Sequence, residues 1–157
     1  MSGDPLKRNF MKYWLPVVLW MGFVFWMSTG TFSSEQTSRF IGPLLDFLFP
    51  QLPSQNIDML HGLIRKAGHV TEYFILGLLL FRAIRGNSQQ GWRLRWAVYA
   101  VIGVVLYALS DELHQSFSSS RTSSLVDVGI DSAGGVLSQF AIIFREKISR
   151  HAAQRHP

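Results

Sequence analysis

Residues 96–113 read WAVYAVIGVVLYALSDEL, and this stretch decides the fold of the chain. Residues 96–110 carry no formal charge, whereas two acidic residues, Asp111 and Glu112, stand near its end. A helix that crosses the hydrocarbon core of a bilayer needs about 20 mostly apolar residues. The stretch therefore predicts a membrane-spanning helix with carboxylates at one end.

Three further apolar stretches have nearly the length of a span: residues 13–28, 66–84 and 125–144. Charged residues make up 16% of the chain, whereas soluble domains carry about 25%. Four such helices in a soluble domain of this size would leave almost no polar face to solvate. We therefore predict a single all-α domain, an integral membrane bundle of four helices. The absence of cysteine excludes disulfides and thiolate metal sites.

The basic residues predict the orientation of the bundle. Short loops rich in Lys and Arg stay in the cytoplasm, which favours cytoplasmic N and C termini. That side then holds eleven of the fifteen Lys and Arg residues: Lys7, Arg8, Lys12, Arg82, Arg85, Arg93, Arg95, Arg145, Lys147, Arg150 and Arg155. We expect the basic tail, residues 145–157, to contact anionic lipid headgroups rather than nucleic acid.

The first connection, residues 29–64, is long and contains a short apolar stretch around Phe47. That stretch is too short to span, and we expect Pro43 to break it and Pro50 to end it. It predicts a short interfacial or re-entrant helix that covers the outer face. A second short helix is expected to be capped by Ser54 and to carry Ile57, Leu60 and Ile64 on one side.

Three of the predicted helices bring polar side chains to the same depth. At about 1.5 Å per residue, His69, Asp111 and Asp131 each lie about 20 to 24 Å from the basic residue that ends their helix on the cytoplasmic side. They therefore share a level in the outer third of a core about 30 Å thick. The depths predict one shared pocket beneath the membrane surface opposite the termini.

Helical phase sorts the polar groups onto shared faces. Spacings of three and four residues place the members of each set on one side of a helix: Arg65, His69 and Glu72; Asp111 and Gln115; Asp127 and Asp131. Gly134 and Ser138 continue the last stripe as a small pair that permits close helix packing. Ser124 followed by Asp127 predicts a capping box at the start of the fourth helix.

The free energy of burying carboxylates gives this cluster its importance. One ionised carboxylate deep in lipid costs at least about 2.5–3.5 kcal/mol, and five acidic residues lie at this level: Glu72, Asp111, Glu112, Asp127 and Asp131. They must be paired, hydrated or neutralised, or must hold a cation. Pairing with Lys66 and Arg121 is one alternative. A divalent-cation site built from Asp111, Glu112 and Asp127 is the other, and the sequence leaves both open.

Three motifs in order carry a resemblance. They are RKAGHVTEY at residues 65–73, SDELHQSF at residues 110–117, and Arg121 followed by Ser124, Asp127, Asp131 and Gly134. In these motifs the chain resembles the VanZ-like family of small bacterial membrane proteins, from about Trp14 to Phe144. It departs from many relatives at Ser119-Ser120, where they have Pro-Gly. The resemblance implies a multi-pass protein of the bacterial cell (inner) membrane, in a family whose founding member is linked to resistance to the glycopeptide teicoplanin.

The candidate site follows from the cluster and the motifs together. The candidates for acid–base catalysis are His69, Glu72, Asp111, Glu112, Asp127 and Asp131. The candidates for substrate binding are Arg65, Lys66, Tyr73, Gln115 and Arg121. A purely structural interpretation also stands: His69 and Glu72 can form an interhelical hydrogen bond that locks the bundle.

Three classes of function stay open. The protein can alter the cell envelope or glycopeptide susceptibility without catalysis. It can be an intramembrane hydrolase or transferase that acts on a phospholipid or lipid-linked substrate. It can also be a proton- or ion-coupled carrier, although a carrier needs polar residues through the full depth, and the inner halves of the helices are apolar, as at residues 76–81 and 98–106.

Overall fold

The computed structural model describes residues 5–29, 34–116 and 124–155, and this part of the chain contains helices and no strand. Its helices include four that are long and apolar enough to cross a membrane: Leu6–Ser28, Ser54–Arg85, Leu94–Ser116 and Leu125–Ala152. The first of them comprises α1 (Pro5–Asn9), the π-helical segment η1 (Phe10–Trp14) and α2 (Leu15–Ser28). The prediction of an all-α, four-span membrane bundle is confirmed.

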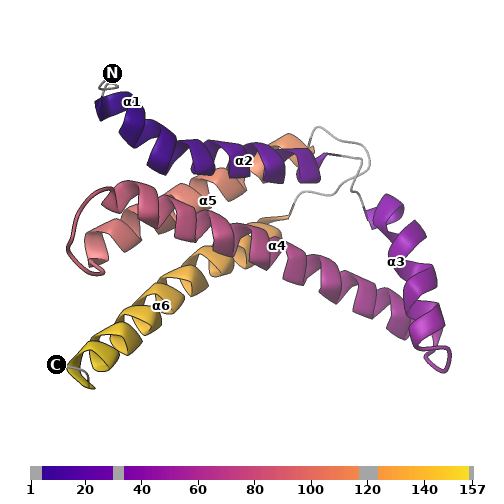
Figure 1. The fold of residues 1–157 in the computed structure, drawn as a ribbon. Coiled ribbons are helices and arrows are strands. Elements are labelled where there is room, and N and C mark those ends of the chain that lie inside the picture. Colours follow the sequence, from indigo (N-terminus) through magenta and orange to yellow (C-terminus); the bar gives the residue numbers. More distant parts are fainter. Residues whose placement is uncertain (1–4, 30–33, 117–123, 156–157) are drawn as a thin grey trace.

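The spans form a bundle with two distinct ends. Helix α4 (Ser54–Arg85) packs along both α5 (Leu94–Ser116) and α6 (Leu125–Arg155), and α2 lies against α4. Both chain termini and the α4–α5 turn lie at one end, which we call the terminal end (Figure 1). Helices α2 and α5 finish at the opposite end, where α6 begins, and we call this the distal end.

Glycines allow α4 and α6 to approach closely. A Cβ atom on Gly134 would lie 3.1 Å from the backbone nitrogen of Phe74 and against the backbone oxygen of Val70. A Cβ atom on Gly77 would collide with the side chain of Ser138. The close packing predicted for the Gly134 and Ser138 stripe is therefore present in the structure, and α4 and α6 share a tight seam.

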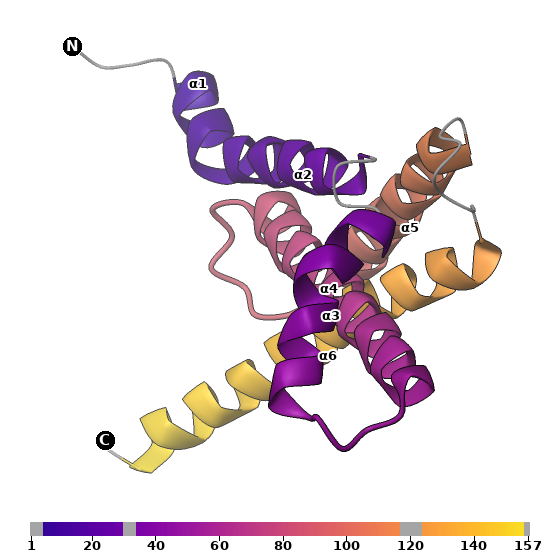
Figure 2. The ribbon, with the colours of Figure 1, turned by 90° about the vertical axis from the view of Figure 1, so that its right-hand side faces the viewer.

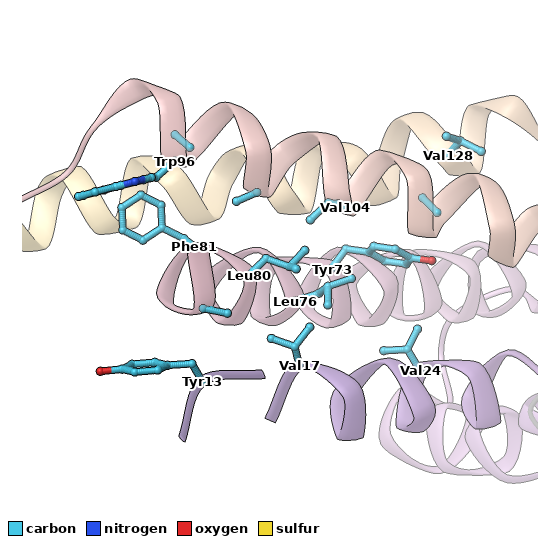
Figure 3. Close-up of a cluster of buried hydrophobic side chains, with 14 residues drawn as sticks. Tyr13, Val17, Val24, Tyr73, Leu76, Leu80, Phe81, Trp96, Val104 and Val128 are labelled. Atoms are coloured by element: carbon cyan, nitrogen blue, oxygen red, sulfur yellow. The ribbon is translucent and has the colours of Figure 1, made fainter. Parts of the chain in front are cut away.

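The centre of the bundle is a mainly apolar core. It extends from Tyr13 and Phe81 near the terminal end to Val24 and Val128 near the distal end (Figure 3). Between these ends the buried side chains include Leu76, Leu80, Ala100, Val104 and Ala108. Many large apolar side chains face outward instead, among them Trp26, Leu106 and Phe140. This arrangement suits a lipid solvent, because lipid solvates exposed apolar side chains.

The first connection differs from the prediction in two respects. Helix α3 (Ser34–Leu48) continues through Pro43, which lies inside it, so the predicted break is wrong. A missing N–H removes one helical hydrogen bond, and here it does not end the helix. The predicted second short helix is the first part of α4, which runs unbroken from Ser54 to Arg85. Helices α3 and α4 form a hairpin whose far end projects beyond the bundle (Figures 1 and 2).

Candidate functional site

A pocket of about 190 Å³ lies at the distal end, between the end of α2, helix α3, the middle of α4 and the end of α5. We call it the distal pocket. Helix α4 contributes Arg65, His69 and Glu72 to its lining, and α5 contributes Asp111. Apolar and small polar residues complete the lining: Met27, Ser28, Thr37, Ile41, Ile64 and Gly68. The three α4 residues predicted to share a helix face thus line one pocket.

His69 stands between two carboxylates from different helices. Its Nδ1 atom lies 3.6 Å from Oδ1 of Asp131 on α6 and 3.9 Å from Oε2 of Glu72 on its own helix. The His69 side chain is 30% exposed, whereas the Asp131 side chain is 2% exposed. The His69 imidazole is therefore accessible from the pocket, whereas the Asp131 carboxylate behind it is buried.

Acidic residues of three helices gather in the lining of the distal pocket and directly behind it. Asp131 interacts electrostatically with Asp111 and Glu112 of α5, and with Glu72 of α4. Asp111, Glu112 and Asp131 are all buried. Within the described residues, Oδ1 of Asp111 and Oδ1 of Asp131 accept no hydrogen bond. Buried polar atoms without a partner are unfavourable, so these two oxygen atoms add nothing to the stability of the bundle.

Gln115 does not line the pocket but forms hydrogen bonds with two residues that do. Its Nε2 atom donates hydrogen bonds to Oδ2 of Asp111 at 2.8 Å and to Oγ of Ser28 at 2.9 Å. The side chain is buried and connects α5 with α2. Gln115 was predicted to bind substrate, and in the structure it orients Asp111. Ser28 was not among the candidates, because a serine at the end of an apolar run carries no distinctive signal.

Glu112 caps the fourth span. Its Oε2 atom accepts a hydrogen bond from the backbone N–H of Ser124 at 2.7 Å, and Oγ of Ser124 accepts one from the N–H of Val126 at 3.2 Å. Ser124 therefore caps α6 as predicted, but the reciprocal acid is Glu112 of α5 and not Asp127. A carboxylate is favourable at this position because the N-terminus of a helix carries partial positive charge.

Tyr73 lies in the core beside the site. It is fully buried, and its hydroxyl points toward the distal end (Figure 3). Asp111 and Asp131 lie within electrostatic range of that hydroxyl, which has no hydrogen-bond partner among the described residues. Tyr73 was predicted to bind substrate, but it does not line the distal pocket in this structure.

Two aromatic residues that were not predicted hold α2 against the site. Nε1 of Trp20 donates a hydrogen bond to the backbone oxygen of Glu72 at 2.9 Å. The Tyr107 hydroxyl donates one to the backbone oxygen of Met21 at 2.5 Å. Both hydrogen bonds join two helices and have a backbone carbonyl as the acceptor. Every residue has such a carbonyl, so the sequence does not indicate which one accepts the bond.

Two candidates for substrate binding remain. Lys66 is exposed and is not part of the lining, and Arg121 lies outside the described residues. Across residues 5–29, 34–116 and 124–155, no three His, Asp or Glu side chains converge as metal ligands. The metal set predicted from Asp111, Glu112 and Asp127 is therefore not assembled. Asp111 and Glu112 are consecutive, and consecutive helical side chains point about 100° apart.

A family model described as VanZ/LLP1 matches residues 13–145. The chain belongs to the VanZ/LLP1 family. No curated protein and no solved structure matches it. The VanZ/LLP1 match includes every residue that lines the distal pocket. In this VanZ/LLP1 protein the pocket combines a cation, an accessible imidazole and two carboxylates beside an apolar wall. Such a set can bind a polar group and transfer a proton to or from it.

Proposed function

We propose that this VanZ/LLP1 protein acts on the polar headgroup of an envelope amphiphile, either a phospholipid or a lipid-linked cell-wall precursor, in the distal pocket. The observation that carries the proposal is the position of His69, accessible in the pocket and backed by the buried carboxylate of Asp131. The mixed lining supports an amphiphile, because Met27, Ile41 and Ile64 offer an apolar wall beside the polar groups.

The chemistry would be hydrolysis or group transfer with proton transfer through His69. The imidazole would take the proton of the attacking hydroxyl, from water or an acceptor alcohol, and return it to the leaving group. The buried Asp131 carboxylate would orient the ring and stabilise its protonated form. Arg65, on the same pocket lining, would neutralise a phosphate oxygen of the headgroup.

The distribution of basic residues supports an orientation for this reaction. Arg82 and Arg85 lie in the last turn of α4 and Arg145 lies in the second half of α6, all toward the terminal end, and cytoplasmic loops carry the excess of Lys and Arg. With the termini in the cytoplasm of a bacterial cell, the distal pocket would face the outer side of the cell membrane. Cell-wall precursors are displayed there, and the resemblance to a family linked with teicoplanin resistance agrees with that location.

The apolar core argues against transport through a single copy of the chain. The deeper polar residues of α6 do not extend the site, because the Ser138 hydroxyl donates to the backbone oxygen of Gly135 and accepts from Gln139. Tyr73, Leu76 and Val104 are also completely buried between the two ends. A carrier would need a polar path through this region.

The direct test compares purified protein variants on isolated envelope lipids and lipid-linked precursors, with product formation followed by mass spectrometry. We expect His69→Gln and Asp131→Asn to lower turnover by about 10²–10⁴-fold, the usual contribution of a positioned acid–base group. Asp58→Asn, which changes an exposed acid on α4, is the matched control and should leave turnover unchanged.

Two outcomes would overturn the catalytic proposal. Undiminished turnover in both site variants would remove His69 and Asp131 from the chemistry. Retention of an amphiphile by the wild type, with no conversion of any lipid or precursor, would leave a binding protein that affects the envelope without catalysis.

A further inference from the structure

A second and larger cavity, of about 450 Å³, lies at the terminal end. It is formed by the N-terminal segment, the last turns of α4 and the second half of α6, and we call it the terminal cavity. Its lining has four cationic side chains, Lys12, Arg82, Arg85 and Arg145. The remaining lining is aromatic or apolar apart from the backbone of one glycine: Tyr13, Leu78, Leu79, Phe81, Gly86 and Ile142.

The four cations are not neutralised within the described part of the chain. None of them forms an ion pair there, and no acidic residue lines the cavity. Glu146, an acid on the same end of α6, is already engaged, because it accepts hydrogen bonds from the backbone N–H of Trp92 and from Nη2 of Arg150. The cavity therefore concentrates positive charge, and the described residues supply no counter-ion to it.

Contacts with the protein hold three of the cations in place. Nε of Arg85 donates a hydrogen bond to the backbone oxygen of Ser88 at 3.2 Å. The Arg82 guanidinium and the Lys12 ammonium both lie over the Tyr13 ring, 5.6 Å and 4.9 Å from its centroid. Nη2 of Arg82 also donates a hydrogen bond to the backbone oxygen of Lys12 at 3.1 Å. A guanidinium has five N–H donors, so Arg82 keeps donors for an anion after this bond.

We propose that the terminal cavity binds the phosphate of an anionic phospholipid from the leaflet at the terminal end. The cations suit the phosphate, because Arg and Lys bind phosphate oxygens by charge-assisted hydrogen bonds. The apolar part, with Leu78, Leu79 and Ile142, suits the first carbons of an acyl chain. A free phosphate would gain nothing from that wall, which favours a lipid over a soluble anion. The site is separate from the distal pocket and does not depend on its function.

The experiment measures lipid binding to the full-length protein in neutral detergent by native mass spectrometry. Dioleoyl phosphatidylglycerol is titrated against wild type and against the double variant Arg82→Gln/Arg145→Gln. The control is Arg93→Gln/Lys147→Gln, which removes the same charge from exposed residues at the same end and outside the cavity. We expect the cavity variant to bind the lipid about tenfold or more weakly, since each surface cation contributes a substantial part of headgroup affinity. The control should lose much less.

Competition identifies the group that is recognised. Dioleoylglycerol, which lacks the phosphate, should not displace the lipid, and millimolar inorganic phosphate should displace it poorly. Equal losses in the cavity and control variants would reduce the effect to general surface charge and overturn the proposal. Efficient displacement by inorganic phosphate would assign the cavity to a soluble anion and also overturn it. If the double variant does not remain monodisperse, the single substitutions Arg82→Gln and Arg145→Gln carry the same comparison.

Discussion

At the residue scale, the central feature is a buried carboxylate that faces other acids. Asp131 has one imidazole beside it and interacts electrostatically with Asp111, Glu112, Asp127 and Glu72. Sites that are arranged for binding or chemistry commonly carry such locally unfavourable groups at the expense of stability. Stability and function are therefore expected to respond in opposite directions to neutralisation of this side chain.

Asp131→Asn tests that opposition. The amide keeps the shape of the carboxylate and removes its repulsion from the neighbouring acids. We expect the free energy of unfolding to rise by about 1 kcal/mol while turnover in the lipid assay falls. Thermal or denaturant unfolding in detergent measures the first quantity, with Asp58→Asn as the control. A variant that is clearly less stable than wild type would show that Asp131 is a structural ion-pair partner.

Glu112→Ala tests the cap that joins α5 to α6. Loss of the carboxylate leaves the N–H of Ser124 without its acceptor, and we expect a destabilisation of about 1–3 kcal/mol. Glu112→Gln retains an acceptor oxygen and should lose less. Unfolding midpoints of the two variants in the same detergent give the comparison. An alanine variant as stable as wild type would contradict the capping role.

The relative positions of candidate residues could be predicted where the residues lie on the same helix. Rise and phase along α4 are fixed by helix geometry, so the shared face of Arg65, His69 and Glu72 followed from spacing alone. The partners of Gln115 and Glu112 lie on other helices. Those contacts depend on how each helix is rotated against its neighbours, which a single sequence does not specify.

At the scale of elements, the close contact between α4 and α6 depends on glycines, which have no side chain. A Cβ atom on Gly134 would press on the backbone of α4, and a backbone cannot move aside as a flexible side chain can. The helices would have to separate, and packing along their whole contact would suffer.

Gly134→Ala should therefore destabilise the bundle by about 1–3 kcal/mol. Gly129→Ala is the matched control on the same helix, since a Cβ atom there meets nothing within 4 Å. That control should be neutral or slightly stabilising because alanine favours helix over glycine. Unfolding measurements should show Gly134→Ala to be clearly less stable than Gly129→Ala, and equal effects would refute the seam.

Helix α3 should lie with its apolar face in lipid. Phe47 is 81% exposed and Phe40 is 80% exposed, and the helix is amphipathic, so its apolar face suits the membrane interface. A nitroxide on Phe47→Cys in proteoliposomes should be more accessible to oxygen than to a water-soluble nickel complex. A label on Gln51→Cys in the following turn should show the reverse. Matching behaviour at the two positions would place α3 in water.

The spans were predictable because apolar length is a strong signal, and all four predicted segments lie within observed helices. The helix near Ser54 was predicted, but its continuity with the span was not, because residues 54–65 were judged separately on local signals alone. Packing against α3 supports these turns as a continuation of the span. The prediction that Pro43 breaks a helix was wrong for the same reason. A rule based on local sequence was applied to a helix that the elements around it support.

At the scale of the whole molecule, orientation can be tested without altering a native cysteine, because the chain has none. Asp58→Cys lies on α4 toward the distal side, and Ser149→Cys lies on α6 at the terminal end; both residues are exposed. In intact cells, a membrane-impermeant maleimide should label position 58 and should label position 149 only after the cells are opened. The reverse pattern would invert the proposed topology and place the distal pocket in the cytoplasm.

Helix α4 contributes residues to both the distal pocket and the terminal cavity. Residues 64–72 of α4 contribute to the distal pocket, and residues 78–86 border the terminal cavity through the end of the same helix. A ligand in either hollow that displaces α4 relative to α6 alters the other hollow as well. By thermodynamic reciprocity, each ligand then changes the affinity of the other by the same factor. The lipid composition of one leaflet would in this way regulate binding in the distal pocket at the opposite leaflet, because helix α4 connects the two sites.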